Sequence, residues 1–161
     1  MFRKAIERII RDEGGYVNDS TDLGGETKYG ISKRSFPDLD IKNLTVEEAI
    51  NIYERLYWIP SKAEKLPKEI QEVYFELVVN AGQGNAVKIL QRACNSKLKP
   101  KLEVDGKIGA MTIGQAQKLS RKRFIAYQTL YYADIVFRKP EQERFWFGWF
   151  NRAVDDLQEG E

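Results

Sequence analysis

Apolar residues recur at helical spacing through most of the chain, which predicts a mainly α-helical protein. The first such stretch covers residues 2–13, where charged residues separate the apolar positions. Its apolar stripe consists of Phe2, Ala5, Ile6, Ile9 and Ile10. Glycines at positions 14 and 15 should end this helix, because glycine readily adopts the left-handed conformation found just past helix ends.

A capping signal predicts the start of the second helix. Thr45 precedes Glu48 by three residues, the spacing at which the two residues cap each other's backbone amides. The positions expected on the buried face of this helix are Val46, Ala49, Ile50, Tyr53 and Tyr57. Pro60 should end the helix or bend the chain just after it.

Two further helices are expected after Pro67, with Gly82 and Gly84 between them. The apolar stripe of the first consists of Ile70, Val73, Tyr74, Leu77, Val78 and Ala81. The stripe of the second consists of Ala86, Ile89, Leu90, Ala93 and Cys94, where the cysteine is interpreted as a small core residue.

A polar connection from residue 97 to residue 107 then suggests a soft boundary. Beyond it, one predicted stripe consists of Phe124, Tyr127, Leu130, Tyr131 and Ile135, and another of Phe145, Trp146, Trp149, Phe150 and Val154. We interpret the two tryptophans as core residues. The basic run at residues 121–123 is interpreted as a solvated helix face.

Residues 16–31 interrupt the helical pattern. This segment is rich in glycine, asparagine and aspartate, so it predicts turns with short irregular or β pieces near Tyr16 and Tyr29. The expected fold is therefore mainly α with a small β segment. Glycine density of this kind also lets the backbone approach a ligand closely.

Composition removes several classes of chemistry. The 161 residues contain no histidine, which excludes Ser-His-Asp and Cys-His mechanisms and a histidine-based zinc site. The net charge of +2 argues weakly against nucleic acid as the main partner. No stretch approaches the roughly 18 apolar residues of a membrane span, so no stable membrane insertion is expected. The N-terminus lacks the apolar region of a signal peptide, which predicts synthesis in the cytoplasm.

Glu13 is the leading candidate for acid–base chemistry. A carboxyl group at a helix C-terminus meets the negative end of the helix dipole, which disfavours its ionised form. A carboxylic acid that keeps its proton near neutral pH can protonate a glycosidic oxygen, and a second carboxylate usually assists. Asp19, Asp22 and Glu26 follow in the glycine-rich segment. Backbone capping and a calcium loop are the alternative interpretations of these acids.

These residues resemble a known signature. The stretches 13–19 (Glu-Gly-Gly-Tyr-Val-Asn-Asp) and 23–32 (Leu-Gly-Gly-Glu-Thr-Lys-Tyr-Gly-Ile-Ser) closely resemble that of the glycoside hydrolase family 108 N-acetylmuramidases, lysozyme-like enzymes of phages and Gram-negative bacteria. The similarity continues through residues 56–58, 79–82 and 90–91 and ends near residue 152. One departure is Glu76, where the family has aspartate. Residues 104–109 resemble the start of peptidoglycan-binding modules, or are simply a turn that begins a helix.

The resemblance implies Glu13 as the general acid. The spacing of Glu13, Asp22 and Thr27 also resembles the Glu–Asp–Thr arrangement of phage-type lysozymes, which implies that Asp22 stabilises the transition state and Thr27 holds the water. Glu26 is the alternative to Asp22. The implied organisation is a lysozyme-like catalytic region at residues 1–95 and a helical, peptidoglycan-binding-like region at residues 96–161 that packs on the first.

The implied substrate is peptidoglycan, cleaved at the β-1,4 bond between N-acetylmuramic acid and N-acetylglucosamine by a monomer without metal or organic cofactor. The expected glycan-contacting residues are Tyr16, Glu26, Tyr29, Trp58, Asn80 and Gln83, although Trp58 fits the core equally well. The enzyme would act on the cell wall after release or non-classical export. The alternatives are a non-catalytic wall-binding or secretion-accessory protein, and a transglycosylase that forms a 1,6-anhydro product.

Overall fold

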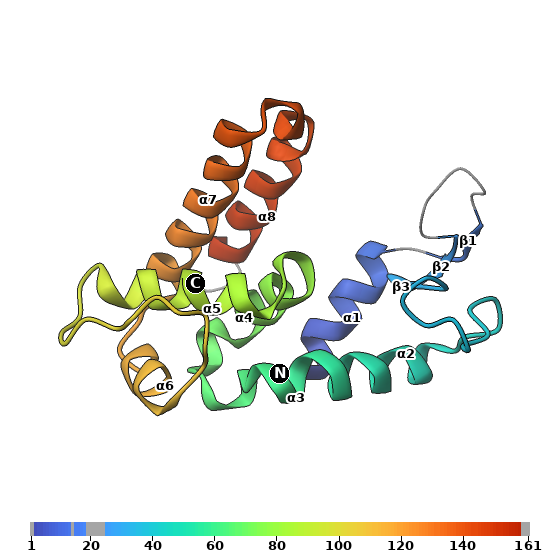
Figure 1. Cartoon of the computed structure of the whole chain (residues 1–161), viewed down its shortest axis with the longest axis horizontal. Coiled ribbons are helices and arrows are strands. Elements are labelled where there is room, and N and C mark those ends of the chain that lie inside the picture. The colour runs from blue at the N-terminus through green and yellow to red at the C-terminus, as the bar shows by residue number, and fades with distance from the viewer. Residues whose placement is uncertain (1, 14, 19–24, 159–161) are drawn as a thin grey trace. The chain divides into compact units, whose positions relative to one another are not determined.

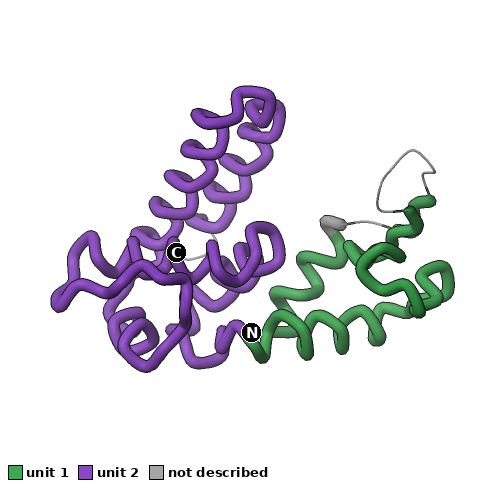
Figure 2. The backbone as a smooth tube through the Cα atoms, in the orientation of Figure 1, with its two compact units in different colours: residues 1–60 green, residues 61–161 purple. Residues whose placement is uncertain are grey.

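The structure, a computed structural model, describes residues 2–13, 15–18 and 25–158 (Figure 1). It is mainly helical with one small antiparallel sheet, so the predicted fold class is confirmed. The chain divides into two units, residues 1–60 and residues 61–161 (Figure 2). Within the described ranges, none of the helices combines the length and the apolar character that crossing a bilayer requires.

The first unit opens with α1 (Phe2–Glu13), as predicted from its apolar stripe. Ala5, Ile6 and Ile9 of this stripe are buried. Three short strands follow: β1 (Val17–Asn18), β2 (Glu26–Lys28) and β3 (Ile31–Ser32), in the order β1-β2-β3. The β segment therefore lies within the predicted residues 16–31. α1 packs against α2, and Ile31, Ile41 and Leu44 are also buried.

Helix α2 (Val46–Tyr53) begins with the predicted capping box. The Thr45 hydroxyl accepts a hydrogen bond from the Glu48 amide at 3.3 Å, and the Glu48 carboxylate accepts one from the Thr45 amide at 2.8 Å. Ala49, Ile50 and Tyr53 are buried as expected, but Val46 is 42% exposed. Val46 is the first residue of the helix, where no preceding turn covers its side chain.

Pro60 lies one residue before the end of this helical stretch, and Lys62 then has a φ of +55°, so the predicted bend just after Pro60 is confirmed. The chain continues through a π-helical turn, η1 (Glu54–Trp58), into α3 (Ile59–Ser61). The Ile59 amide donates to the Glu54 carbonyl, five residues back, instead of the usual four. Proline lacks an amide hydrogen and its ring crowds the preceding turn, and the wider π turn accommodates both defects.

The second unit begins at Ser61. A 3₁₀ turn, η2 (Ala63–Lys65), leads into α4 (Lys68–Ala81), which is buried all round from Ile70 to Val78. Gly82 has a φ of +81° and separates α4 from α5 (Gln83–Asn95). The predicted stripes of both helices are confirmed, apart from partial exposure of Ala81.

The remaining helices are α6 (Ala110–Ala116), α7 (Arg121–Arg138), the 3₁₀ segment η3 (Pro140–Phe145) and α8 (Trp146–Gln158). α7 and α8 lie side by side as a hairpin, and α7 also packs on α5 and α4 (Figure 1). The rings of Tyr132 and Trp149 stack between α7 and α8 with centroids 4.7 Å apart. Trp146 and Trp149 are both half-buried, so the prediction that they are core residues is confirmed only in part.

Two predictions about α7 are only partly correct, although Phe124 is buried and Lys122 is exposed as expected. Its buried positions are Phe124, Ile125, Gln128 and Tyr132, whereas Leu130 of the predicted stripe is 60% exposed. Arg121 does not belong to a solvated face either. Its guanidinium donates to the Asp156 carbonyl at 2.7 Å and lies 3.9 Å from the fully buried Asp156 carboxylate. This arginine therefore ties the start of α7 to α8.

Candidate active site

The candidate site is built on the end of α1 and the small sheet that follows. Glu13 is the last residue of α1, as the helix-end argument requires, and its side chain lies outside the part that the structure describes. Asp22 also lies outside the described residues, as does Asp19 of the alternative calcium loop. The described geometry of the site therefore comes from the sheet.

Thr27 occupies the centre of the sheet. It pairs with Val17 of β1 on one side and with Ser32 of β3 on the other. A residue paired on both sides has its backbone fixed, which suits a group that must hold a water molecule in place. Successive strand residues point to opposite faces, so the side chain of Glu26 lies on the face opposite that of Thr27.

Glu26 is already engaged by a neighbouring strand. The Tyr16 hydroxyl donates a hydrogen bond of 2.7 Å to the Glu26 carboxylate. Through this hydrogen bond, Glu26 raises the pKa of the Tyr16 phenol above its ordinary value, because the phenolate could not donate and would be repelled. The structure thus brings together Tyr16 and Glu26, two of the residues expected to contact glycan.

Tyr29 stands in a two-residue hairpin turn between β2 and β3. Tyr29 and Gly30 have φ angles of +54° and +75°, the pattern of a type I′ turn, while Lys28 pairs with Ile31 across it. Positive φ is common for glycine but uncommon for a bulky side chain. The turn therefore holds the Tyr29 ring at the cost of backbone strain, and such strain tends to occur at functional positions.

The sequence did not predict what supports this turn. The buried Tyr53 of α2 donates a hydrogen bond of 3.0 Å to the Tyr29 carbonyl. A buried tyrosine hydroxyl normally needs a hydrogen-bond partner. The predicted burial of Tyr53 was therefore the signal in the sequence from which such a hydrogen bond could have been expected. Lys28 adds a second tie, because its ammonium group donates to the Lys42 carbonyl at 3.0 Å and lies 5.4 Å from the Tyr29 ring centroid.

The other expected glycan contacts belong to other elements of the chain. Trp58 is only 7% exposed, and its ring centroid is 5.3 Å from that of Phe2. Its position is therefore that of a core residue, the alternative that the sequence left open. Asn80 and Gln83 belong to the second unit, where they flank the α4–α5 junction at Gly82. Asn80 is exposed and Gln83 half-buried. Glu76, the departure from the family pattern, is 4% exposed within α4.

The motif at residues 104–109 has a clear structural role. The side chain of the buried Gln91 donates to the Asp105 carboxylate at 2.8 Å and accepts from the Gly106 amide at 3.0 Å. Gly106 has a φ of +78°, and a Cβ atom there would lie 2.9 Å from the Gly84 carbonyl oxygen. These contacts hold the turn before α6 in place, so the residues of this motif have a structural role.

Comparisons with known proteins agree with this architecture. Residues 6–82 match the family model described as glycosyl hydrolase 108, and residues 85–154 match the model described as a predicted peptidoglycan domain. The structure of Brucella abortus SagA is similar, with a TM-score of 0.76 and 27% identity over 99% of this chain and 92% of that one. No match was found among curated proteins.

Proposed function

We propose that this chain, which belongs to the glycosyl hydrolase 108 family and carries a peptidoglycan domain, cleaves the β-1,4 bond between N-acetylmuramic acid and N-acetylglucosamine. The family matches make it a glycoside hydrolase that acts on peptidoglycan. The observation that supports the finer proposal is the position of Glu13 at the C-terminal end of α1, directly before the sheet that carries Thr27. The predicted boundary between the catalytic region and the C-terminal region at residue 95 stays a prediction. The match to the first family model ends at residue 82, and the match to the second begins at residue 85.

In this proposal Glu13 is the general acid. Its proton passes to the glycosidic oxygen as the bond to the anomeric carbon breaks, and a water molecule adds to that carbon and gives up one proton to a carboxylate, which restores the acid form of the site. We expect the negative end of the α1 dipole to favour the protonated form of the Glu13 carboxyl group. The protein supplies all of these groups itself, so the reaction needs no metal or organic cofactor.

We assign the roles that assist the general acid, stabilising the transition state and positioning the water, to Asp22 and Thr27. Glu26 is the rival, but its carboxylate is committed to the Tyr16 hydroxyl and lies on the opposite face of the sheet from Thr27. Glu26 and Thr27 therefore cannot both line the same side of the sheet. Thr27 would position the water and Asp22 would stabilise the positive charge that develops on the sugar.

The decisive experiment replaces Glu13 with glutamine, which keeps the shape of the side chain and removes its acidity. Loss of a general acid typically lowers the rate by about 10²–10⁴-fold. Release of new reducing ends from defined peptidoglycan should fall by that factor in Glu13→Gln, while Tm stays near that of the parent. Glu7→Gln is the matched control, because Glu7 is an exposed glutamate on the same helix.

Three outcomes would count against the proposal: a Glu13→Gln variant that digests peptidoglycan at the parent rate, a parent protein that releases no reducing ends, or products with the mass of 1,6-anhydro sugars. Asp22→Asn, Thr27→Ala and Glu26→Gln separate the second roles. The first two should lower kcat, whereas Glu26→Gln should retain most of it. The reverse order would move the second role to Glu26.

A further inference from the structure

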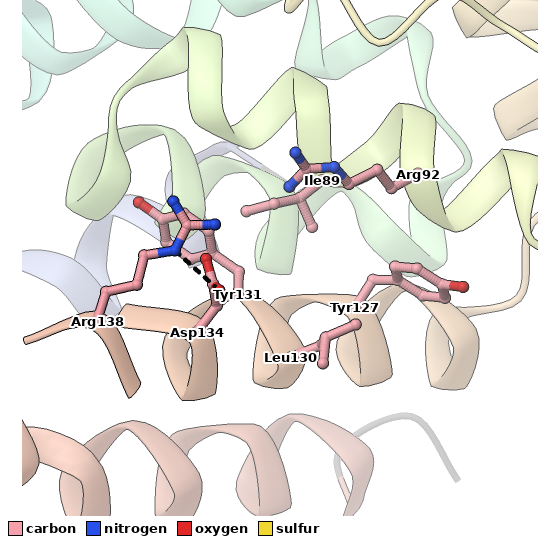
Figure 3. Close-up of a pocket in the computed structure, with 7 residues that line it drawn as sticks. All are labelled: Ile89, Arg92, Tyr127, Leu130, Tyr131, Asp134 and Arg138. Atoms are coloured by element: carbon pink, nitrogen blue, oxygen red, sulfur yellow. Dashed lines mark hydrogen bonds and ion pairs between the residues drawn. The ribbon is translucent and has the colours of Figure 1, made fainter. Parts of the chain in front are cut away.

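A groove between α5 and α7 in the second unit has the features of a binding site. It encloses about 330 Å³, within the range of ligand-sized pockets. Figure 3 shows Ile89 and Arg92 of α5 on one side and residues of α7 on the other. The lining residues of α7 are Tyr127, Leu130, Tyr131, Asp134 and Arg138.

On the α7 side of this groove, the side chains form an apolar stripe that neighbouring residues bury only in part. Tyr127, Leu130 and Tyr131 were predicted to be core residues from their helical spacing, yet Leu130 is 60% exposed and both tyrosines are only half-buried. Partial burial raises the pKa of Tyr131 above its ordinary value, so its phenol remains a neutral hydrogen-bond donor at physiological pH. An uncovered stripe of this kind is typical of a surface that receives a ligand.

The charges around the groove are mixed. Arg92 and Arg138 supply two guanidinium groups and Asp134 supplies one carboxylate. Arg138 donates to Asp134 at 3.0 Å, but this pair is an exposed contact one helical turn apart, which a ligand can rearrange at little cost. In the part of the chain that the structure describes, no carboxylate lies within ion-pair distance of Arg92.

We propose that this groove binds the stem peptide of peptidoglycan. A stem peptide that contains a diamino acid carries several carboxylates, an ammonium group and alanine methyl groups. Arg92 and Arg138 would bind carboxylates, for which the guanidinium fork is suited, and Asp134 would bind the ammonium group. The methyl groups would pack on Leu130 and Ile89. This inference rests on the proposed function, because it takes peptidoglycan as the substrate.

The groove would therefore hold the enzyme on the wall through the peptide, while the first unit acts on the glycan. A glycan without peptide offers only the single lactyl carboxylate of each N-acetylmuramic acid and no ammonium group to Asp134, whereas the stem peptide offers both kinds of charge. Charge complementarity thus favours the peptide over the sugar as the occupant of this groove.

Calorimetric titration of the full chain in the Glu13→Gln background, which prevents digestion, tests the proposal with three probes. These are free stem tetrapeptide, the disaccharide-tetrapeptide, and the same disaccharide without peptide. The tetrapeptide should bind, and Arg92→Glu should weaken its binding at least tenfold while Arg92→Lys retains part of it. Leu130→Asp, a change at an exposed position that folding tolerates, should also weaken binding.

Lys118→Glu is the matched control, because it makes the same charge reversal at an exposed site of this unit outside the groove. Lys107→Glu tests the rival cavity of about 400 Å³ beside the Asp105–Gly106 turn. The proposal is overturned if the tetrapeptide does not bind, if Arg92→Glu and Leu130→Asp bind it normally, if Lys107→Glu alone abolishes binding, or if the peptide-free disaccharide binds equally well.

Reducing-end release from peptide-free glycan strands, measured with the catalytic Glu13 in place, separates this test from that of the proposed function. Arg92→Glu should match the parent in that assay. A parent that releases no reducing ends but binds the tetrapeptide through Arg92 would refute the hydrolytic mechanism and leave the groove assignment standing.

Discussion

Replacing Tyr29 with asparagine should raise stability and lower activity at the same time. Tyr29 has a φ of +54°, and the left-handed conformation costs a bulky L-residue about 1–2 kcal/mol. Asparagine adopts this conformation more readily. The variant loses the contact between Lys28 and the half-buried Tyr29 ring, worth about 0.5–1 kcal/mol. Tyr53 still donates to the carbonyl of residue 29, because that acceptor belongs to the backbone.

The net gain is about 1 kcal/mol, which corresponds to a rise in Tm of roughly 2–4 °C for a chain of this size. If the Tyr29 ring packs on a sugar, its loss should cost about 1 kcal/mol of binding, or roughly a fivefold higher KM. Thermal melting and initial rates on soluble glycan strands measure the two effects separately. A clear fall in Tm would refute the strain argument, and an unchanged KM would refute the assignment of Tyr29 to substrate binding.

Lys62 provides the matched control, because it has a φ of +55° and lies in the second unit. Lys62→Asn gains the same relief of strain and loses the hydrogen bond from its ammonium group to the Ile108 carbonyl, which is 3.1 Å long. Its Tm should therefore stay within a few degrees of the parent's, and its KM should not change.

Two further predictions concern the second unit. Gln91→Ala should lower the free energy of unfolding by about 2–4 kcal/mol, because it removes the partners of Gly106 and Asp105 around a buried side chain; urea unfolding measures this. Gln117→Ala, which removes exposed hydrogen bonds, is the control and should cost less than about 0.5 kcal/mol. Cys94 is fully buried and burial raises the pKa of its thiol to about 11, so its thiolate form is scarce at pH 8. A maleimide should label Cys94 slowly in the native protein and rapidly in urea, and fast native labelling would contradict its core position.

Local signals predicted much of the fold. The capping residues Thr45 and Glu48 and the stripes of α1, α4 and α5 were identified correctly, because capping and amphipathic spacing depend on residues within one or two turns. The glycine-rich segment was correctly predicted to contain the β pieces. For the site, the sequence placed Glu13 at the end of a helix, and the structure agrees. The short strand piece expected near Tyr29 begins only at Ile31, because Tyr29 and Gly30 form the turn before it.

The errors share one physical cause, which is that spacing reveals an apolar face but not what covers it. Tyr127, Leu130 and Tyr131 have core spacing, yet they line an open groove between α5 and α7. The role of Arg121 depends on Asp156, which lies 35 residues away in the sequence. The hydrogen bond from Tyr16 to Glu26 depends in the same way on the register of two strands, which composition does not reveal.

The π-helical turn before Pro60 changes how this stretch should be aligned with other sequences. Tyr53 and Trp58 are both buried although they are five positions apart, a spacing that would place them about 140° apart around a regular α-helix. The turn in effect accommodates one inserted residue and returns the helix to the same buried side. A relative that lacks this residue should show a single-position gap between 54 and 58, and we expect it also to lack the proline, since a regular helix would have no wide turn to accommodate it.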